Sequence, residues 1–217
     1  MATPSGTGKR STASGSRKST TRDTLLDVTA EIMLEEGYAA ATSRRVADKA
    51  GVQRALVYYY FPTMDDLYLA VLRRGTQTNL DTQRAALDSD TPLRALWDMT
   101  MDPRGTRLVW EFMALGNHRK AIRAELAAGA ERFREAQIAA LTFILRDHPG
   151  ADVLPPEAVS ILLASVGRVL VLERGLGITT GHDVTLQVVD EYLRRFEMSP
   201  RTEAAPPDHA SEPASES

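Results

Sequence analysis

The chain of 217 residues contains no cysteine, so disulfide bonds, thiol nucleophiles and zinc–thiolate sites are excluded. It also lacks an apolar run long enough to span a membrane, because the most apolar stretch, residues 158–172, is interrupted by Ser160, Ser165 and Arg168. Its basic N-terminus is not followed by an apolar segment, so no secretory signal is predicted. These absences predict a cytoplasmic protein with no membrane partner.

Catalytic and metal-binding patterns are absent as well. The four histidines lie far apart in the sequence, with no paired spacing of metal ligands. No serine stands in the glycine-flanked turn of a hydrolase nucleophile. We therefore predict no metal site, no cofactor and no enzymatic activity.

Acidic residues outnumber basic ones, and the two are unevenly distributed. The formal net charge is −3, which argues against a uniformly nucleic-acid-binding surface. Residues 1–74 nevertheless carry 11 Lys and Arg against 8 Asp and Glu, whereas residues 75–217 carry 15 against 21. A basic N-terminal part on an acidic body is typical of a nucleic-acid-binding module joined to another domain, although basic tails are common in general.

Apolar residues recur at intervals of three and four, so the fold class is predicted as all-α. Residues 1–21 and 199–217 have no apolar period and are expected to be disordered tails around a unit at 22–74 and a larger helical domain at 75–198. Thr20 with Asp23, and Thr63 with Asp66, resemble capping boxes. The expected helices are 22–36, 43–50, 53–60, 63–74, 76–88, 92–101, 105–117, 119–147, 156–174 and 183–197.

Residues 42–61 have the pattern of a helix-turn-helix, with a short helix, a turn at Gly51 and a second short helix that Pro62 ends. Three consecutive tyrosines, residues 58–60, fall in the second helix. At 100° per residue they fan over about 200°, so if Val57 and Phe61 face inward then Tyr59 faces outward. An exposed phenol suits a phosphate oxygen, and an aromatic surface patch beside ordinary packing is the alternative interpretation.

The residues around the tyrosines favour DNA as the partner. Arg44, Arg45 and Arg54 surround the same face. Thr42 and Ser43 offer hydroxyls and backbone N–H groups at a helix N-terminus, where anions bind.

The start of the second helix is where such units usually read base edges. Gln53 can pair with adenine and Arg54 with guanine, while Ala55 is small enough to permit close approach. The two short helices therefore combine groups that suit phosphates with groups that suit bases.

The segment "GYAAATSRRVADKAGVQRALVYYYFPTMDDLYLAVLRR", Gly37 to Arg74, resembles the DNA-binding domain of the TetR family of bacterial regulators. The residues that carry the resemblance are Gly37-Tyr38, Thr42, Val46-Ala47, Ala50-Gly51-Val52, Tyr58, Phe61 and Leu67. It implies a homodimeric regulator that binds double-stranded DNA at a palindromic operator. Repression would be released by a small, mostly apolar effector.

The resemblance also implies roles for single residues. Thr42 and Arg44 would bind DNA phosphates, Tyr58 and Tyr60 would bind the DNA backbone, and Tyr59 would lie near the groove of the DNA. The family often has lysine at position 64, where this chain has methionine, so Thr63 is expected to supply that phosphate contact. The predicted DNA-binding set is Thr42, Ser43, Arg44, Arg45, Gln53, Arg54, Ala55, Tyr58, Tyr59, Tyr60 and Thr63.

The helix at 156–174 is apolar on nearly every side, so it must be buried on every side, and a second subunit could cover one of them. The helix at 119–147 has a broad apolar stripe. The resemblance favours a dimer interface built from this pair, with central core helices as the alternative. The predicted interface residues are Phe133, Leu141, Leu162, Val166, Val169 and Leu170. Arg168, within the apolar helix, needs a buried acceptor.

Methionine and tryptophan gather in residues 97–118 around a few polar groups, which suits an adaptable apolar pocket. Ordinary core packing is the alternative for each of these side chains. The predicted pocket residues are Trp97, Met101, Trp110, Met113, Asn117 and His118. A rival hypothesis for the whole chain is an all-α small-molecule-binding or enzymatic protein that does not use DNA.

Overall fold

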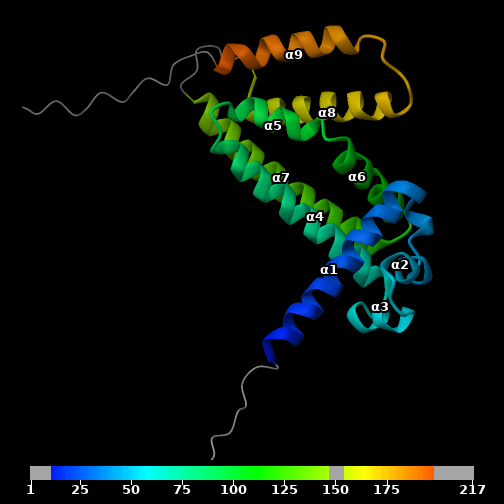
Figure 1. Ribbon diagram of the computed structural model, residues 1–217. Coiled ribbons are helices and arrows are strands. Elements are labelled where there is room, and N and C mark those ends of the chain that lie inside the picture. The colour runs from blue at the N-terminus through cyan, green and yellow to red at the C-terminus, as the bar shows by residue number, and fades with distance from the viewer. Residues whose placement is uncertain (1–10, 147–153, 198–217) are drawn as a thin grey trace, which may run out of the picture.

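The computed structural model describes residues 11–146 and 154–197, and within them every regular element is a helix. Figure 1 shows a small N-terminal group, α1 to α3, joined to a larger body by the long helix α4. None of these helices is long and apolar enough to cross a bilayer. The elements are α1 (Ser11–Glu36), η1 (Tyr38–Ala40), α2 (Ser43–Ala50), α3 (Arg54–Tyr60), α4 (Met64–Leu87), α5 (Pro92–Thr100), α6 (Pro103–Gly116), α7 (Lys120–Leu145), α8 (Pro156–Gly175) and α9 (His182–Glu197).

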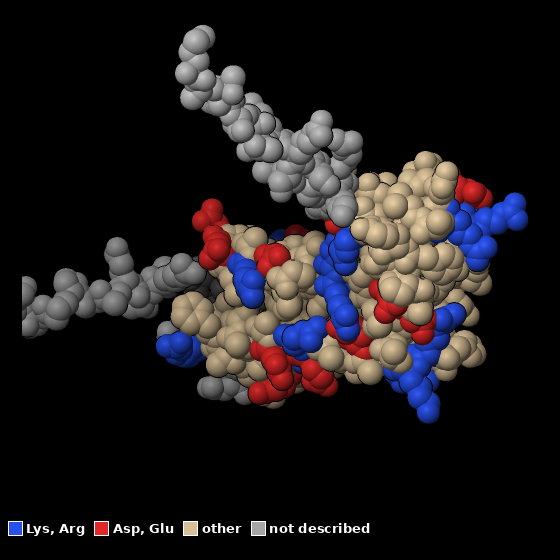
Figure 2. All heavy atoms as spheres, turned by 90° about the horizontal axis from the view of Figure 1, so that it is seen from below, with Lys and Arg blue, Asp and Glu red and all other residues tan. Residues whose placement is uncertain are grey.

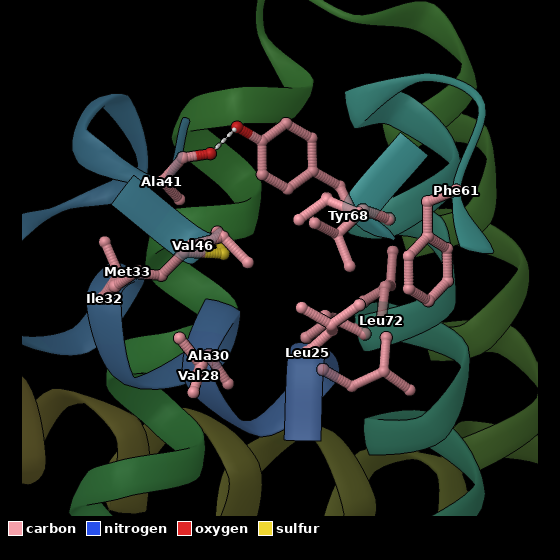
Figure 3. Packing of buried hydrophobic residues seen from close by; sticks show 14 of the residues in the cluster. Leu25, Val28, Ala30, Ile32, Met33, Ala41, Val46, Phe61, Tyr68 and Leu72 are labelled. Atoms are coloured by element: carbon pink, nitrogen blue, oxygen red, sulfur yellow. Dashed lines mark hydrogen bonds between the residues drawn. The ribbon is translucent and has the colours of Figure 1, made fainter. Parts of the chain in front are cut away.

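The first apolar core joins α1, α2, α3 and the start of α4 (Figure 3), and residues of α6 and α7 in the larger body complete it. Leu25, Ile32, Val46 and Val57 have no exposed surface. Burying side chains of this size contributes about 1.5–3 kcal/mol each. The hydroxyl of Tyr68 in α4 donates to the carbonyl of Ala41 at 2.7 Å, so α4 is tied to the segment before α2 by a buried hydrogen bond.

A second apolar core lies in the larger body and is formed by α4, α5, α7, α8 and α9. Within it α4 and α7 lie side by side (Figure 1). Gly129 of α7 permits their close approach, since a Cβ there would lie 2.9 Å from the Thr76 hydroxyl oxygen. The second core therefore lies within the larger body, whereas the first core joins that body to the N-terminal group. The predicted boundary between two domains after residue 74 stays a prediction.

Two predicted helix boundaries are wrong. α1 begins at Ser11 and runs through Thr20, whose carbonyl accepts from Thr24, so no capping box starts a helix there. A formed helix extends at little cost, so a segment without an apolar period can continue it. The expected break at Gly75 is also absent, because packing of α4 against α7 outweighs the roughly 1 kcal/mol that a helical glycine costs.

The other predictions about elements hold to within a few residues. Thr63 and Asp66 form the predicted capping box of α4. Gly37, with φ of 84°, ends α1 where a left-handed residue is needed. Of the expected tails, residues 1–10 and 199–217 lie outside the described residues, whereas residues 11–21 belong to α1.

Candidate nucleic-acid interface

The two short helices cross at a turn that their sequence dictates. Thr42 caps α2, and its hydroxyl accepts from the backbone N–H of Arg45 at 3.3 Å. Gly51 takes φ of 66°, a left-handed conformation that favours glycine, and its N–H closes the last turn of α2. The Val52 N–H then donates to the Ala47 carbonyl at 3.0 Å. These bonds fix the direction in which α3 leaves α2.

α3 turns one side toward the core and the other toward solvent. Val57 is fully buried and Phe61 nearly so, whereas Tyr59 is 63% exposed. Tyr60 is half-buried and meets Tyr59 edge to face, with ring centroids 5.2 Å apart. The predicted orientation of the tyrosines is therefore confirmed, and their role in DNA binding stays a prediction.

A hydrogen-bonded unit of Ser43, Arg54 and Tyr58 links α2 to α3. The Arg54 Nε donates to the Ser43 Oγ at 2.9 Å, and one of its Nη groups donates to the Tyr58 hydroxyl at 3.2 Å. The same guanidinium lies 5.5 Å from the centre of the Tyr58 ring, within cation–π range. The hydroxyls of Ser43 and Tyr58 are 3.0 Å apart. The side chains of Arg54 and Tyr58 are therefore already oriented before either contacts a phosphate.

This unit changes the prediction for Ser43 and adds a property of Tyr58. The sequence predicts a free hydroxyl at Ser43, but Ser43 is 4% exposed and its oxygen is already bonded. It is a positioning residue because it holds Arg54 and Tyr58. Hydrogen bonding to Ser43, followed by that to Arg54, lowers the pKa of the Tyr58 phenol, which makes it a stronger hydrogen-bond donor.

The two arginines at the start of α2 have different surroundings. The guanidinium of Arg45 pairs with both carboxylate oxygens of Glu36 in α1, which raises its pKa and lowers that of Glu36. Arg44 is 85% exposed at its side chain and approaches only Asp48, at 3.9 Å, among the described residues. Arg44 is therefore the cation available to a phosphate, while Arg45 serves to hold α2 against α1.

Thr63 is already engaged at the start of α4. Its hydroxyl donates to the Asp66 carboxylate at 2.8 Å, and its backbone N–H donates to the same oxygen at 2.9 Å. A phosphate would have to displace a carboxylate there. The predicted replacement of the missing lysine by Thr63 is not supported by this geometry.

Gln53, in contrast, makes no capping bond with its side chain at the start of α3, and both it and Ala55 are exposed. Together with Val52, Leu56 and Tyr59 they line a shallow, mostly apolar hollow. An amide at the edge of such a surface can pair with a base, and the apolar floor can contact a thymine methyl.

Charges of both signs share the side of the molecule on which α3 lies. Figure 2 shows Lys and Arg side chains interspersed with Asp and Glu, with large areas that carry neither. Arg22 of α1 adds a cation beside the end of α3, 5.2 Å from the centre of the Phe61 ring. This residue is missing from the predicted set because nothing in the sequence relates it to α3.

The predicted effector pocket is divided by the structure. Trp97 is 4% exposed in the second core, with Met101 packed against it. Trp110 and Met113 lie on an exposed face of α6, at 41% and 51% exposure, and Asn117 and His118 are exposed as well. The six residues therefore do not surround one pocket, because Trp97 lies in the second core whereas Trp110 lies on the exposed face of α6.

The predicted dimer residues are divided in a similar way. Leu141 and Leu170 are buried inside the monomer, so they are core residues. Leu162 and Val169 are each 49% exposed on α8, while Phe133 and Val166 are half-buried. Large apolar side chains are also exposed on α9, at two valines that the predicted set does not contain, and on α7 at Phe143. The large apolar side chains exposed on α8 and α9 are Ile161, Leu162, Val169, Leu172, Val184 and Val188.

Comparison with known proteins agrees with this geometry. Residues 25–71 match the family model described as bacterial regulatory proteins, tetR family. The HTH-type transcriptional activator FasR of Mycolicibacterium smegmatis is 34% identical over 99 residues, 42% of this chain and 45% of that protein. The HTH-type transcriptional repressor KstR of the same organism is 37% identical over 76 residues, 35% of this chain and 37% of that protein. The matched part thus spans less than half the length of these curated relatives.

The fold extends the likeness beyond the matched segment. A TetR transcription regulator from Haloarcula marismortui superposes with a TM-score of 0.66 over 81% of this chain and 97% of that one, at 22% identity. At that identity the superposition shows the fold alone. With the family match and the helix-turn-helix geometry together, residues 25–71 form a helix-turn-helix domain of the tetR family of bacterial regulatory proteins, and the chain has the fold of the solved regulator with which it superposes.

Proposed function

We propose that the protein is a DNA-binding transcriptional regulator that acts as a homodimer on a palindromic operator. The observation that carries the proposal is the outward face of α3, where Gln53 is exposed and where Ser43 orients Arg54 and Tyr58. Arg54 and Tyr58 would bind phosphate, and Gln53 would contact a base. The rival hypothesis of a protein that does not use DNA gives these side chains no purpose.

The exposed apolar face of α8 and α9 supports homodimerisation. Val184 and Val188 are one turn apart on α9 and more than 60% exposed, and Leu162 and Val169 add apolar surface on α8. Several large exposed apolar side chains on neighbouring turns are typical of interaction sites. A twofold axis through this face would present both copies of α3 to one duplex, as a palindrome requires.

Contacts between α6 and the N-terminal group support control of DNA binding by an effector. One Nη of Arg107 donates to the Leu34 carbonyl near the end of α1, and the Tyr38 N–H donates to the Glu111 carboxylate, each at 2.7 Å. Movement of α6 or α4 in the larger body would therefore move the helix-turn-helix. An effector can shift this equilibrium only if it binds the two arrangements with different affinity.

DNA binding is tested by fluorescence anisotropy with the DNA upstream of the protein's own gene. We expect sequence-selective binding that weakens as salt rises, because phosphate contacts release counterions. Binding that is absent, or equal on scrambled DNA of the same length, would favour the rival hypothesis. The relatives include one protein named an activator and one named a repressor. We propose repression, and transcription in vitro from the bound promoter tests it, since RNA synthesis that rises on adding the protein contradicts it.

A further inference from the structure

Three buried polar side chains lie inside the larger body, one each on α4, α7 and α8. Ser160 has no exposed surface, Gln137 is 1% exposed and Gln83 is 2% exposed. Ser160 donates to the Gln137 amide oxygen at 2.5 Å. Both polar atoms of the Gln83 amide lack a hydrogen-bond partner among the described residues. Leaving buried polar groups unsatisfied costs about 1–3 kcal/mol each, so Gln83 needs an explanation.

The register of α4 and α7 places Gln83 at about the same level along α7 as Gln137. Arg73 bonds to Glu125 at 2.8 Å, and Thr76 lies against Gly129, so the two helices run parallel with an offset of about 53 residues. Gln83 lies seven residues beyond Thr76, two turns along the same face. It therefore points toward α7 at the level of Gln137.

Arg134 lies next to the polar group and has no counter-ion among the described residues. An Nη of Arg134 donates to the Ser160 Oγ at 2.9 Å. No carboxylate pairs with Arg134 or Arg168 among the described residues, so the acceptor expected for Arg168 is not supplied by them. Burial, followed by the like charge of Arg134, lowers the pKa of Arg168. A guanidinium that has no counter-ion and faces another cation favours an anion.

We propose that Gln83, Gln137, Ser160 and Arg134 form the polar end of the effector site and bind a carboxylate. The planar guanidinium of Arg134 suits the two carboxylate oxygens, and the Gln83 amide supplies a further donor. Ala86, Leu141, Val159 and Leu163, which neighbour these residues on their helices, are apolar and buried. The effector is therefore a molecule with an apolar body and one carboxylate.

This inference rests on the proposed function, and it replaces the mostly apolar effector expected from sequence. The apolar part of that expectation remains, but the residues that would surround the ligand differ. Because α4 and α7 touch at Thr76 and Gly129, a molecule entering beside Gln83 must move one helix relative to the other. A ligand bound at this site would therefore act on α4, the helix that leads to the helix-turn-helix.

The test is thermal unfolding of the full chain with matched probes: decanoate against decanamide, and phenylacetate against phenylacetamide. We expect a carboxylate at about ten times its Kd to raise the Tm by about 3–5 °C, and its amide to raise it much less. Arg134→Met should abolish the shift. Arg174→Met, at an exposed position near the end of α8, is the matched control and should retain it.

Gln83→Leu separates a ligand-binding role from a structural one. If the amide serves only a ligand, the unliganded variant should have an unchanged or higher Tm, while the shift with carboxylate falls by at least half. A variant that loses Tm without ligand and keeps the full carboxylate shift would overturn the proposal. So would equal shifts with acids and amides, or no shift with either.

Failure of the carboxylate site and failure of the proposed function give different results. If operator binding is normal but no carboxylate shifts the Tm, this inference fails while the proposed function stands. If carboxylates shift the Tm but the protein does not bind DNA, the proposed function fails while the carboxylate site stands. If Arg134→Met or Arg168→Met converts the protein to monomers in size-exclusion chromatography with light scattering, the carboxylate belongs to the partner subunit, and the effector proposal is overturned.

Discussion

Replacing Tyr58 by phenylalanine removes one hydroxyl from the Ser43–Arg54–Tyr58 unit and keeps the ring against which Arg54 lies. Ser43 retains its bond from Arg54 at 2.9 Å, so no buried group is left without a partner. Stability should therefore change by less than about 1 kcal/mol, or by less than about 4 °C in Tm. A loss of DNA affinity larger than this change in stability must therefore come from the missing contact between the Tyr58 hydroxyl and DNA.

The expected loss of affinity follows from one hydrogen bond in each subunit. A hydrogen bond to a charged group contributes about 1.5 kcal/mol at the lower end of its range, which is about tenfold in Kd. A dimer loses two such bonds, so Tyr58→Phe should weaken binding about 100-fold. Because the bond is to phosphate, the loss should be similar on operator and on scrambled DNA.

The assay is fluorescence anisotropy at several salt concentrations between about 50 and 200 mM. Tyr58 carries no charge, so the slope of log K against log salt should stay as in the wild type. Arg44→Gln is the matched comparison, because losing one cation per subunit should reduce the slope by about 2 in the dimer. Unchanged affinity of Tyr58→Phe would refute the phosphate contact. A loss confined to the operator would show that Tyr58 contributes to base recognition instead.

Four further predictions follow from the same geometry. Gln53→Ala should cost about 1–3 kcal/mol on the operator and relax preference at one base pair per half-site; an unchanged ranking of operator variants contradicts this. Val188→Glu should yield monomers by light scattering while the exposed control Gln187→Glu stays dimeric; a dimeric Val188→Glu protein would place the interface elsewhere. The pKa of Glu125 is lowered from 4.5, chiefly by a guanidinium of α4, so its contribution to stability is present above that pH and is lost as pH falls through the lowered value; urea unfolding should show Glu125→Gln less stable than wild type at pH 7 and equal to it in strong acid. A spin label on Ala39→Cys, the sole cysteine of that variant, should report a changed distance between subunits when a carboxylate effector binds; an unchanged distance contradicts movement of the DNA-binding domains.

Local signals in the sequence are sufficient for much of the fold. Gly37 and Gly51 mark turns because only glycine adopts a left-handed conformation without cost. Thr63 and Asp66 mark a helix start because their capping bonds lie within four residues. The outward direction of Tyr59 follows from helical geometry, since Val57 fixes which side of α3 faces the core. Each of these depends on neighbours along the chain.

Interactions between distant residues could not be predicted in this way. Ser43 looks like a free N-terminal hydroxyl in the sequence, and only the crossing of α2 and α3 buries it under Arg54. Leu162 and Leu170 have the same side chain on the same helix, yet one faces outward and the other faces the core. Which of them is covered depends on where α7 and α9 pack, and periodicity in α8 carries no information on that.

The continuity of α4 gives the proposed control of DNA binding a length scale. Twelve residues separate Thr76, at the contact with α7, from the start of α4 beside the helix-turn-helix, which is about 18 Å of helix. A tilt of about 10° around that contact, comparable to rigid-body rotations in allosteric proteins, would move the start of α4 by about 3 Å. In a twofold dimer the two copies would move in opposite directions, so their separation would change by about 6 Å. That is nearly two base pairs at about 3.4 Å each, roughly a sixth of the spacing between half-sites, and hydrogen bonds to phosphate do not tolerate it. A break in the helix at Gly75, as the sequence predicts, would have absorbed such a tilt as bending; an unbroken helix transmits it.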